Sequence, residues 1–403
     1  MKILIEKSKA EGRIFAPTSK SVAHRALICA AMCEGESHID GLTECEDILA
    51  TIDCLREFGV KIDYADGRAT VIGIDFTKAE PNGILNCRES GSTLRFLIPL
   101  AMLSGNEITI TGSPRLLERS QSVYEQIAKE NNLVFINDGE KIIVKGPLLA
   151  GEYFIDGKIS SQFITGLFLA LSSLSGDSKI IVNKEIESRP YVDITIDVMR
   201  KFGVKVYPDT DWSFYIFGGQ EYRPINLTVD GDWSNAAFLD AFNLIGGNVS
   251  VLGLESESKQ GDKVYREHFS RLDRGYAELD ISNCPDLGPI LFSIAAIKHG
   301  AKFVGTKRLR DKESDRISSM ESELSKFGAE LVTHDNSVTV LKRELHTPSE
   351  PVCGHNDHRI VMSMAVLCSI YGGEIEGCEA VSKSYPNFFN DIKALGIRTN
   401  EIK

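Results

Sequence analysis

The sequence lacks three features that mark special classes of protein. Its longest apolar runs, such as Phe96–Leu103, are far too short to span a bilayer, which needs about 20 residues. No Cys-x-x-Cys pair occurs among its nine cysteines, so we expect buried, reduced thiols in a cytoplasmic protein rather than a disulfide framework. Met1–Ile5 leads directly into charged residues, so we expect no signal peptide.

The chain also has a shortage of positive charge. Its 57 acidic and 45 basic residues give a net charge of -12, which disfavours non-specific binding to DNA or RNA. An anionic small molecule would therefore have to be held by a local cluster of lysines and arginines. The 403 residues, 42% of them hydrophobic, are enough for two or three domains with their own cores.

An internal repeat organises what is present. A helical pattern ends at a glycine or asparagine, the residues that favour a left-handed C-cap, and a short strand pattern follows, with a period of about 70 residues. Six such ends occur: Gly59, Asn132, Gly203, Gly275, Gly328 and Gly396. The interval between Gly275 and Gly328 is shorter than the others, and we therefore expect the fifth unit to be short.

A second family of helices runs in phase with the first. These helices are apolar on nearly every face, so we expect them to be buried. Their predicted ends are Gly35, Gly105, Gly176, Gly247, Gly300 and Gly373. Short β-branched segments such as Ile108-Thr109-Ile110 and Ile180-Ile181-Val182 predict strands between the helices. Each unit is thus strand–helix–strand–helix–strand–strand, and six units divide into two α/β (α+β) domains of three.

The predicted buried helices start at polar and basic sequences. The starts are Ser19-Lys20-Ser21, Ser90-Gly91-Ser92, Ser160-Ser161-Gln162, Asp232-Trp233-Ser234, Asp286-Leu287-Gly288 and Asn356-Asp357-His358-Arg359. Helix capping alone explains any one of them. Three parallel helix N-termini in each domain, facing a cleft, would together attract anions.

A dense group of charges lies in Lys312-Glu313-Ser314-Asp315-Arg316. Four charges in five residues stand before a helical apolar stripe, so we expect them at a helix entrance, where backbone N–H groups favour an anion. A solvated, charge-decorated helix start is the alternative interpretation. The stripe consists of Ile317, Met320, Leu324 and Phe327.

Seven motifs in order along the whole chain resemble one known family. They are Ser19-Lys20-Ser21 with Arg25, Ser90-Gly91-Ser92 with Arg95, Ser160-Ser161-Gln162-Phe163, Pro285-Asp286, Lys312-Glu313-Ser314-Asp315-Arg316, Asp357-His358-Arg359, and Lys383 followed by Pro386. The sequence is similar to the 3-phosphoshikimate 1-carboxyvinyltransferase (5-enolpyruvylshikimate-3-phosphate synthase) family. The resemblance implies an inverse α/β barrel in each domain, with three βαβαββ repeats whose helices lie inside and whose sheets lie outside. It also implies a discontinuous domain of 1–18 with 230–403, an inserted domain of 19–229, and hinges near 18–20 and 229–231.

The resemblance further implies a reaction. Enolpyruvyl passes from phosphoenolpyruvate to the 5-hydroxyl of shikimate 3-phosphate by addition and elimination, on the route to the aromatic amino acids. The family needs no metal or organic cofactor. We expect a cytoplasmic monomer whose partners are these two small molecules, without nucleic acid or membrane.

Residue roles follow from the same resemblance. The catalytic residues would be Asp286 as base for the hydroxyl, and Glu313 with Lys20 for proton transfer at the methylene carbon. Shikimate 3-phosphate would bind Lys20, Ser21, Arg25, Ser160, Ser161, Gln162, Ser188, Tyr191, Asp286 and Lys312. Phosphoenolpyruvate would bind Lys20, Gly91, Arg119, Gln162, Arg316, Arg359 and Lys383, with Arg95 and His358 in support.

Two alternatives remain at this point. A sister enzyme that transfers enolpyruvyl to UDP-N-acetylglucosamine shares the fold and phosphoenolpyruvate, but usually has Asn where this chain has Ser21. An anion-binding module without catalysis would not require Asp286 and Glu313 among the cations. We expect packing roles for Cys87 and Trp233, and no metal site at His355 and His358, because no third ligand lies near them on a helical face.

Overall fold

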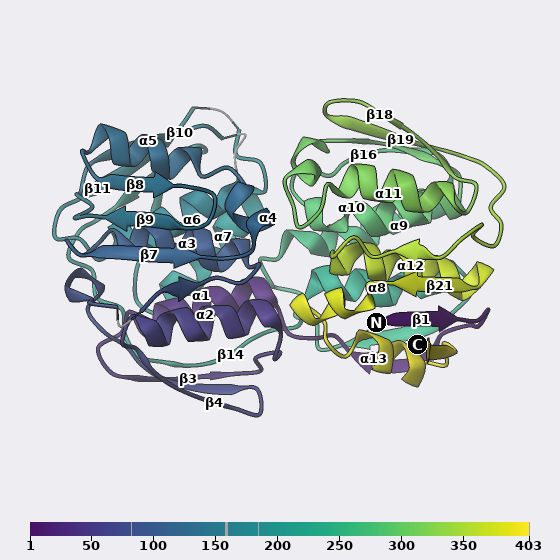
Figure 1. Ribbon diagram of the computed structural model, residues 1–403, viewed down its shortest axis with the longest axis horizontal. Helices are drawn as coiled ribbons and strands as arrows, with labels where there is room; N and C mark the ends of the chain where they lie inside the picture. The colour runs from purple at the N-terminus through teal and green to yellow at the C-terminus, as the bar shows by residue number, and fades with distance from the viewer. Residues whose placement is uncertain (82, 158–159, 184, 403) are drawn as a thin grey trace. The chain divides into compact units, whose positions relative to one another are not determined.

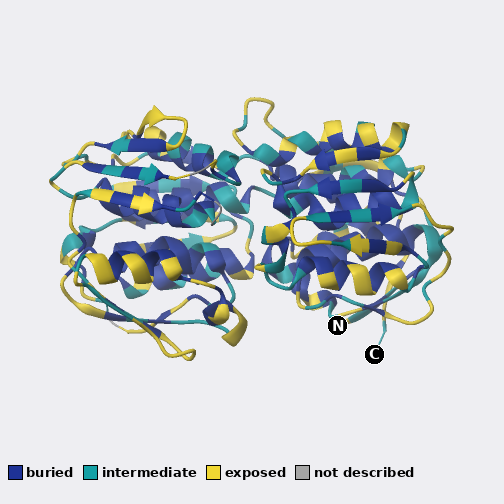
Figure 2. Cartoon of the chain, turned by 90° about the horizontal axis from the view of Figure 1, so that it is seen from above, coloured by how far each residue is buried: buried dark blue, intermediate teal, exposed yellow. Residues whose placement is uncertain are grey.

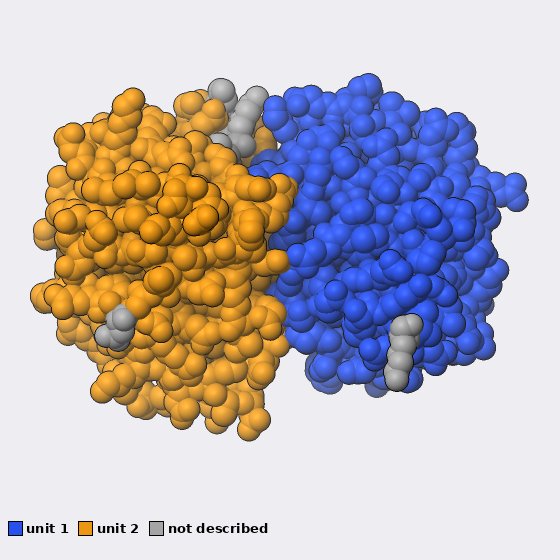
Figure 3. Space-filling model, viewed as in Figure 1, with its two compact units in different colours: residues 1–17, 231–403 blue, residues 18–230 orange. Residues whose placement is uncertain are grey.

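The chain folds into two compact units. The computed structural model describes residues 1–81, 83–157, 160–183 and 185–402. Unit 1 comprises Met1–Pro17 and Gly231–Lys403, and unit 2 comprises Thr18–Asp230 (Figure 3). The expected domains, 1–18 with 230–403 and 19–229, differ from these units by one residue at each crossing.

The three sheets of unit 2 share one topology. In each, the first two strands are parallel and the other neighbours antiparallel, with the fourth strand of the repeat placed between the second and the third. Their orders are β14 (Asn226–Thr228), β3 (Glu36–Asp40), β5 (Arg68–Ile72), β4 (Lys61–Ala65); β6 (Leu85–Asn86), β7 (Glu107–Thr111), β9 (Ile142–Lys145), β8 (Val134–Asn137); and β10 (Glu152–Ile155), β11 (Ser178–Val182), β13 (Ser213–Ile216), β12 (Tyr207–Thr210). Both predicted strand segments are confirmed, in β7 and β11.

Unit 1 repeats this topology twice and then departs from it. The sheets are β20 (Val352–Cys353), β21 (Gly373–Glu376), β1 (Lys2–Ile5), β22 (Thr399–Ile402); β16 (Ala277–Asp280), β17 (Ala301–Val304), β19 (Ser337–Leu341), β18 (Glu330–Thr333); and a parallel pair, β15 (Asn248–Leu252) with β2 (Glu11–Phe15). Three strands pair with segments that are distant in the sequence: β2, which pairs with β15 of the fourth repeat, and β14 and β1. β14 completes the sheet of the first repeat, and β1 completes that of the sixth (Figure 1).

The expectation of a short fifth unit was wrong, because the fourth is the short one. In the fully described stretch from 244 to 276, α9 (Tyr265–Arg274) leads directly into β16 without the hairpin that other repeats place after their second helix. β15 therefore keeps one edge without a neighbouring strand in the described chain. The side chain of Asn243 occupies part of that edge: its Oδ1 accepts from Val249 N at 2.6 Å, and its Nδ2 donates to Val249 O at 2.9 Å.

Six helices are buried almost throughout, as their apolar composition predicted. They are α1 (Lys20–Ala31), α3 (Gly91–Ala101), α6 (Ser161–Leu171), α8 (Trp233–Leu244), α10 (Gly288–Ile297) and α12 (His358–Tyr371). Figure 2 shows buried residues, in dark blue, concentrated in helices. The predicted ends at glycines were too late, because each helix stops two to five residues earlier and the glycine lies before or at the start of the next strand. No helix within the described residues is long and apolar enough to cross a membrane.

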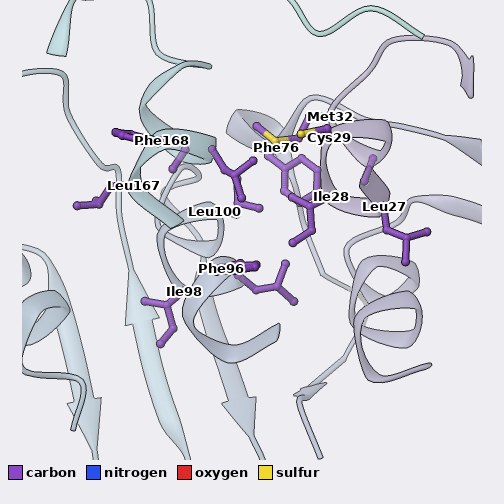
Figure 4. Close-up of a cluster of buried hydrophobic side chains, with 14 of the residues drawn as sticks. Leu27, Ile28, Cys29, Met32, Phe76, Phe96, Ile98, Leu100, Leu167 and Phe168 are labelled. Carbon is purple, nitrogen blue, oxygen red and sulfur yellow. The ribbon is translucent and has the colours of Figure 1, made fainter. Parts of the chain in front are cut away.

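Side chains from the buried helices form one core in each unit. In unit 2, Leu27 and Ile28 of α1, Phe96 of α3, and Leu167 and Phe168 of α6 belong to the same fully buried cluster (Figure 4). Removing this much apolar surface from water is the main stabilising term of such a core. The polar N-terminal turns of the same helices are thereby held in fixed positions.

The second family of helices is amphipathic. Its members are α2 (Glu46–Glu57), α5 (Ser122–Glu130) after the short α4 (Pro114–Glu118), α7 (Arg189–Lys201), α9, α11 (Arg316–Ser325) and α13 (Phe388–Ala394). Left-handed residues follow five of these helices, as predicted: Gly59, Asn132, Gly203, Gly328 and Gly396. Gly275 differs, because its φ of 163° is extended backbone. Short 3-10 turns are η1 (Phe76–Lys78), η2 (Gly261–Val264), η3 (Pro285–Leu287), η4 (Lys307–Arg310) and η5 (Cys378–Lys383).

Candidate active site

The charged stretch Lys312–Arg316 does lie at a helix entrance. Asp315 is the N-cap of α11: its Oδ1 accepts from Ile317 N at 3.1 Å and Ser318 N at 3.2 Å. Its Oδ2 pairs with Arg310 Nη1 at 3.2 Å. Asp315, to which the sequence assigned no chemical role, therefore fixes the start of the helix. The predicted apolar stripe is buried: Ile317, Met320, Leu324 and Phe327.

Arg316 is the centre of the unit 1 cluster. Its guanidinium, 1% exposed, donates to Asp286 Oδ1, Glu313 Oε2 and Asp357 Oδ2, each at 2.8 Å. Burial acts to lower the pKa of Arg316, but Asp357, Glu313 and Asp286 outweigh it and raise the pKa well above its ordinary value. A permanently charged arginine thus holds three carboxylates in place.

Asp286 forms ion pairs with three cations. Besides Arg316, Arg359 Nη2 lies 3.2 Å from its Oδ2, and Lys312 Nζ lies 3.3 Å from its Oδ1. Burial acts to raise the pKa of Asp286, but Arg359, Lys312 and Arg316 together hold it well below the ordinary value. Lys312 shows the opposite balance: burial lowers its pKa to about 8, although Asp286 acts to raise it. The protonation states of Asp286 and Lys312 can therefore change when an anionic ligand binds nearby.

The start of α12 adds the remaining unit 1 residues. Asp357, fully buried, caps the helix by accepting from Arg359 N at 2.9 Å. His358 is buried beside it, with Nδ1 3.9 Å from Asp357 Oδ1. Lys383, at the end of η5, donates from Nζ to Asn356 O at 2.5 Å. The structure therefore brings the predicted residues of the fifth and sixth repeats into one connected cluster.

In unit 2, the first buried helix presents Lys20. Its Nζ lies 2.6 Å from Asp47 Oδ2, and the two side chains are 15% and 11% exposed. Asp47 belongs to the first turn of α2, where acidic residues are ordinary. The sequence therefore carried no signal that Asp47 holds a predicted catalytic lysine.

Arg25 lies deeper in the same helix. It donates to Thr195 Oγ1 and Ser21 O, both at 2.7 Å, and to Tyr191 O at 3.1 Å. Burial lowers its pKa to about 10, so it stays charged at neutral pH. Arg25 thus joins two other predicted ligands, Ser21 and Tyr191, through their backbone oxygens. Thr195 was not predicted, since a threonine inside a helix carries no sequence signal of this role.

The start of α3 brings together Gly91 and Arg119. A Cβ on Gly91 would lie 2.6 Å from Arg119 Nη1 and 3.0 Å from its Cζ. The guanidinium of Arg119, which is 7% exposed, therefore packs directly on the glycine backbone. This contact leaves no room for a side chain at position 91 unless Arg119 moves.

Gln162 links the starts of α3 and α6. Its Oε1 accepts from Arg95 Nη1 at 3.0 Å, and its Nε2 donates to Ser92 Oγ at 3.0 Å. Ser160 caps α6 by accepting from Gln162 N at 3.4 Å. Arg95 thus holds the amide oxygen of Gln162, and its supporting role stays a prediction. The sequence predicted no role for Ser92 beyond the start of the helix.

The other predicted ligands of unit 2 lie at the starts of α6 and α7. Ser161 is the first residue of α6 and is 3% exposed. Ser188 precedes α7 with a φ of 59°, a left-handed conformation that is unusual for serine. Tyr191 lies in the first turn of α7, and its N–H donates to Ser188 O at 3.1 Å. Lys158 and Ile159, just before Ser160, lie outside the described residues.

Residues expected only to pack do so. Trp233 is 4% exposed, donates from Nε1 to Glu255 O at 3.2 Å, and carries Arg266 over its ring. Cys87 is fully buried, and burial raises the pKa of its thiol well above the ordinary value. Within the described ranges, no group of three or more His, Cys, Asp and Glu side chains is arranged to hold a metal ion.

Known proteins with related sequences and structures form a consistent set. The family model described as "EPSP synthase (3-phosphoshikimate 1-carboxyvinyltransferase)" matches residues 5–392. A 3-phosphoshikimate 1-carboxyvinyltransferase of Clostridium kluyveri is 38% identical, covering 99% of this chain and 98% of that protein. One of Clostridium novyi is 39% identical, covering 98% and 97%. The structure of an EPSP synthase from Acinetobacter baumannii matches with a TM-score of 0.79 at 22% identity, covering 99% of this chain and all of that chain.

Proposed function

Since the chain belongs to the EPSP synthase (3-phosphoshikimate 1-carboxyvinyltransferase) family, we propose that it transfers the enolpyruvyl group of phosphoenolpyruvate to the 5-hydroxyl of shikimate 3-phosphate. The products are 5-enolpyruvylshikimate 3-phosphate and inorganic phosphate. The observation that carries this proposal is the carboxylate of Asp286 held among Lys312, Arg316 and Arg359. Such a group can serve as a base next to cations that bind two anionic substrates.

In this proposal the substrates bind the residues that the family resemblance assigns to them. Shikimate 3-phosphate binds the N-terminal turns of α1, α6 and α7. It also binds Asp286 and Lys312. Phosphoenolpyruvate binds Arg316, Arg359 and Lys383, whose positive charges complement its phosphate and carboxylate. It also contacts Lys20, Gly91, Arg119 and Gln162. Helix N-termini and arginine forks suit these groups physically.

Asp286 acts as the base for the 5-hydroxyl. In the unliganded enzyme its pKa is held well below the ordinary value by three cations, so it is ionised but weakly basic. Substrate phosphates and carboxylates that pair with Lys312, Arg316 and Arg359 would weaken their hold on Asp286 and raise its basicity. The carboxylate then accepts the hydroxyl proton as the oxygen attacks C2 of phosphoenolpyruvate.

Glu313 moves the second proton. Glu313 first has to take up a proton; it then delivers this proton to the methylene carbon during addition, with Lys20 assisting, and the methylene becomes a methyl group. In elimination the methyl group returns a proton to Glu313, the C–O bond to phosphate breaks, and the enol ether forms. Arg316, 2.8 Å from Glu313 Oε2, orients this carboxylate.

We propose further that the enzyme is a cytoplasmic monomer that acts on small molecules and does not bind nucleic acid. The crossings near 18–20 and 229–231 would act as hinges when shikimate 3-phosphate binds. Small-angle scattering with and without that substrate tests the hinges, and an unchanged profile would count against them.

Release of inorganic phosphate tests the reaction. The purified protein with shikimate 3-phosphate and phosphoenolpyruvate should release one phosphate per enolpyruvyl product formed, as followed by mass spectrometry. Omitting either substrate should abolish release. Release only with UDP-N-acetylglucosamine as acceptor would identify the sister activity, and no release with either acceptor would leave an anion-binding module; both outcomes contradict the proposal.

A further inference from the structure

A buried acid on α11 lies outside the set of residues with assigned roles. Glu323 is 1% exposed, two turns along the helix whose start carries Arg316. Its Oε1 lies 2.7 Å from His355 Nε2, and its Oε2 accepts from Cys353 N at 2.7 Å and pairs with Lys326 Nζ at 2.9 Å. Burial acts to raise the pKa of Glu323, but His355, Lys326 and Cys353 N outweigh it and lower the pKa. One carboxylate thus holds two points of the turn, at Cys353 and His355, and a lysine at the end of its own helix.

The turn that Glu323 holds is strained. His355 and Asn356 are consecutive non-glycine residues with left-handed backbone, at φ of 48° and 53°. L-residues adopt this region rarely, so two in succession persist only when the surroundings hold them there. Lys326 Nζ also donates to Pro351 O at 3.0 Å, which fixes the approach to the turn.

Three residues with assigned roles depend on the turn. Asn356 O accepts the hydrogen bond from Lys383 Nζ at 2.5 Å. Asp357, the next residue, pairs with Arg316 Nε at 2.8 Å. It also caps the helix that carries Arg359. A change in the backbone at His355 or Asn356 would therefore move the partners of three cations.

We propose that Glu323 and His355 are positioning residues for phosphoenolpyruvate. Their contact keeps the turn in its left-handed conformation and so sets Lys383, Arg316 and Arg359. This inference rests on the proposed function, because that proposal assigns the three cations to phosphoenolpyruvate. In the proposed mechanism, neither Glu323 nor His355 touches the reacting atoms.

The test compares substitutions in steady-state kinetics. Glu323→Ala and His355→Leu should each raise KM for phosphoenolpyruvate about tenfold or more, since small displacements of binding groups are costly. KM for shikimate 3-phosphate should stay within about twofold. Hydrogen exchange of residues 352–358 should rise in both variants.

Two further variants serve as controls. Glu321→Ala removes an exposed glutamate from the same helix and should change neither KM nor exchange. His355→Gln keeps a donor for Glu323 and is unbranched at Cβ like leucine, so both carry the same backbone strain. His355→Gln should therefore recover much of the loss seen in His355→Leu. That pair also decides the question if Glu323→Ala fails to fold.

Three results would overturn the inference. KM for phosphoenolpyruvate could remain within about twofold of wild type in both variants. Alternatively, both KM values could rise together with a lower melting temperature, which would indicate a merely structural role. Absence of turnover in the wild-type enzyme would overturn the proposed function as well, and this arm separates the two failures.

Discussion

Arg316 Nη1 lies 2.8 Å from Asp286 Oδ1, and the arginine is buried while the carboxylate is one-fifth exposed. The pair belongs to a network in which Arg316 also holds Glu313 and Asp357. The proposed base and the proposed proton carrier are thus fixed by one guanidinium. Activity should consequently be sensitive to the charge of each member.

Asp286→Asn should lower kcat by about 10²- to 10⁴-fold, because an amide cannot accept the hydroxyl proton. It should also destabilise the fold by about 3–5 kcal/mol, the typical cost of removing one partner from a buried ion pair. Single-turnover kinetics and chemical denaturation measure the two effects. Asp335→Asn, at an exposed pair with Lys307, is the control and should alter neither. Near wild-type turnover in Asp286→Asn would remove Asp286 from its role.

Lys312 should make binding of shikimate 3-phosphate depend on pH. Its pKa is about 8, so it is an ammonium below that pH and increasingly neutral above it. A dianion favours the ammonium form, so the dissociation constant should rise by up to about tenfold per pH unit above pH 8, with proton uptake on binding. Calorimetry in buffers of different ionisation enthalpy measures that uptake.

The control for this prediction is Lys312→Arg. A guanidinium stays charged across this range, so the variant should bind with little pH dependence between 8 and 10. The stability of the fold should depend on pH in a different way from substrate binding. Because the folded pKa of Lys312 is lower than its unfolded value, its charge opposes folding below pH 8. That cost should be relieved as pH rises from about 8 towards the unfolded value. Binding that strengthens above pH 8 would contradict the assignment.

Gly91→Ala should weaken phosphoenolpyruvate more than shikimate 3-phosphate. The new Cβ would lie 2.6 Å from Arg119 Nη1, so the guanidinium must move. We expect KM for phosphoenolpyruvate to rise about tenfold or more. In Gly105→Ala, the matched control, the added Cβ would meet nothing within 4 Å in the described chain. Equal effects of both alanines would indicate that Arg119 does not hold this substrate.

Asn243→Ala should expose the open edge of the short fourth repeat. Val249 loses its two side-chain partners, which should cost about 1 kcal/mol of unfolding free energy. An unpaired strand edge also favours pairing between chains, so self-association should increase with concentration. Light scattering after size-exclusion chromatography measures it. Asn248→Ala, at an exposed position of β15, should do neither. An unchanged monomer fraction would show that other features protect this edge.

Periodicity in the sequence predicted most of the fold. The two helix families recur because each repeat must bury one apolar helix, and the glycines or asparagine mark real left-handed residues at five helix ends. The distant pairings of β1, β2 and β14 were beyond such reasoning, since pairing between distant segments leaves no local pattern. The short repeat was assigned to the fifth unit and not to the fourth. The spacing between Gly275 and Gly328 shows that residues are missing from this interval, but not on which side of the boundary between the two repeats they are missing.

The site was predictable where charge is concentrated. Lys312, Arg316 and Arg359 stand at helix starts, and the structure brings them to one carboxylate. Their supports were not predictable. Asp47 resembles any acidic residue in a first helical turn, and Glu323 resembles any glutamate on an amphipathic helix. Only packing reveals which of these carboxylates are buried beside a cation.

The distant pairings of β14 and β1 also set an order of events during protein synthesis. The sheet containing β3, β4 and β5 cannot be completed until β14 has left the ribosome, after nearly the whole of unit 2 has been made. β1 is made first and must wait for β21 and β22, which are made last. Unit 2 can therefore complete its sheets on a nascent chain, whereas the sheet of β1 in unit 1 cannot be completed until β22 has been made. A ribosome stalled in the last strand would carry one finished unit and one without its closing sheet.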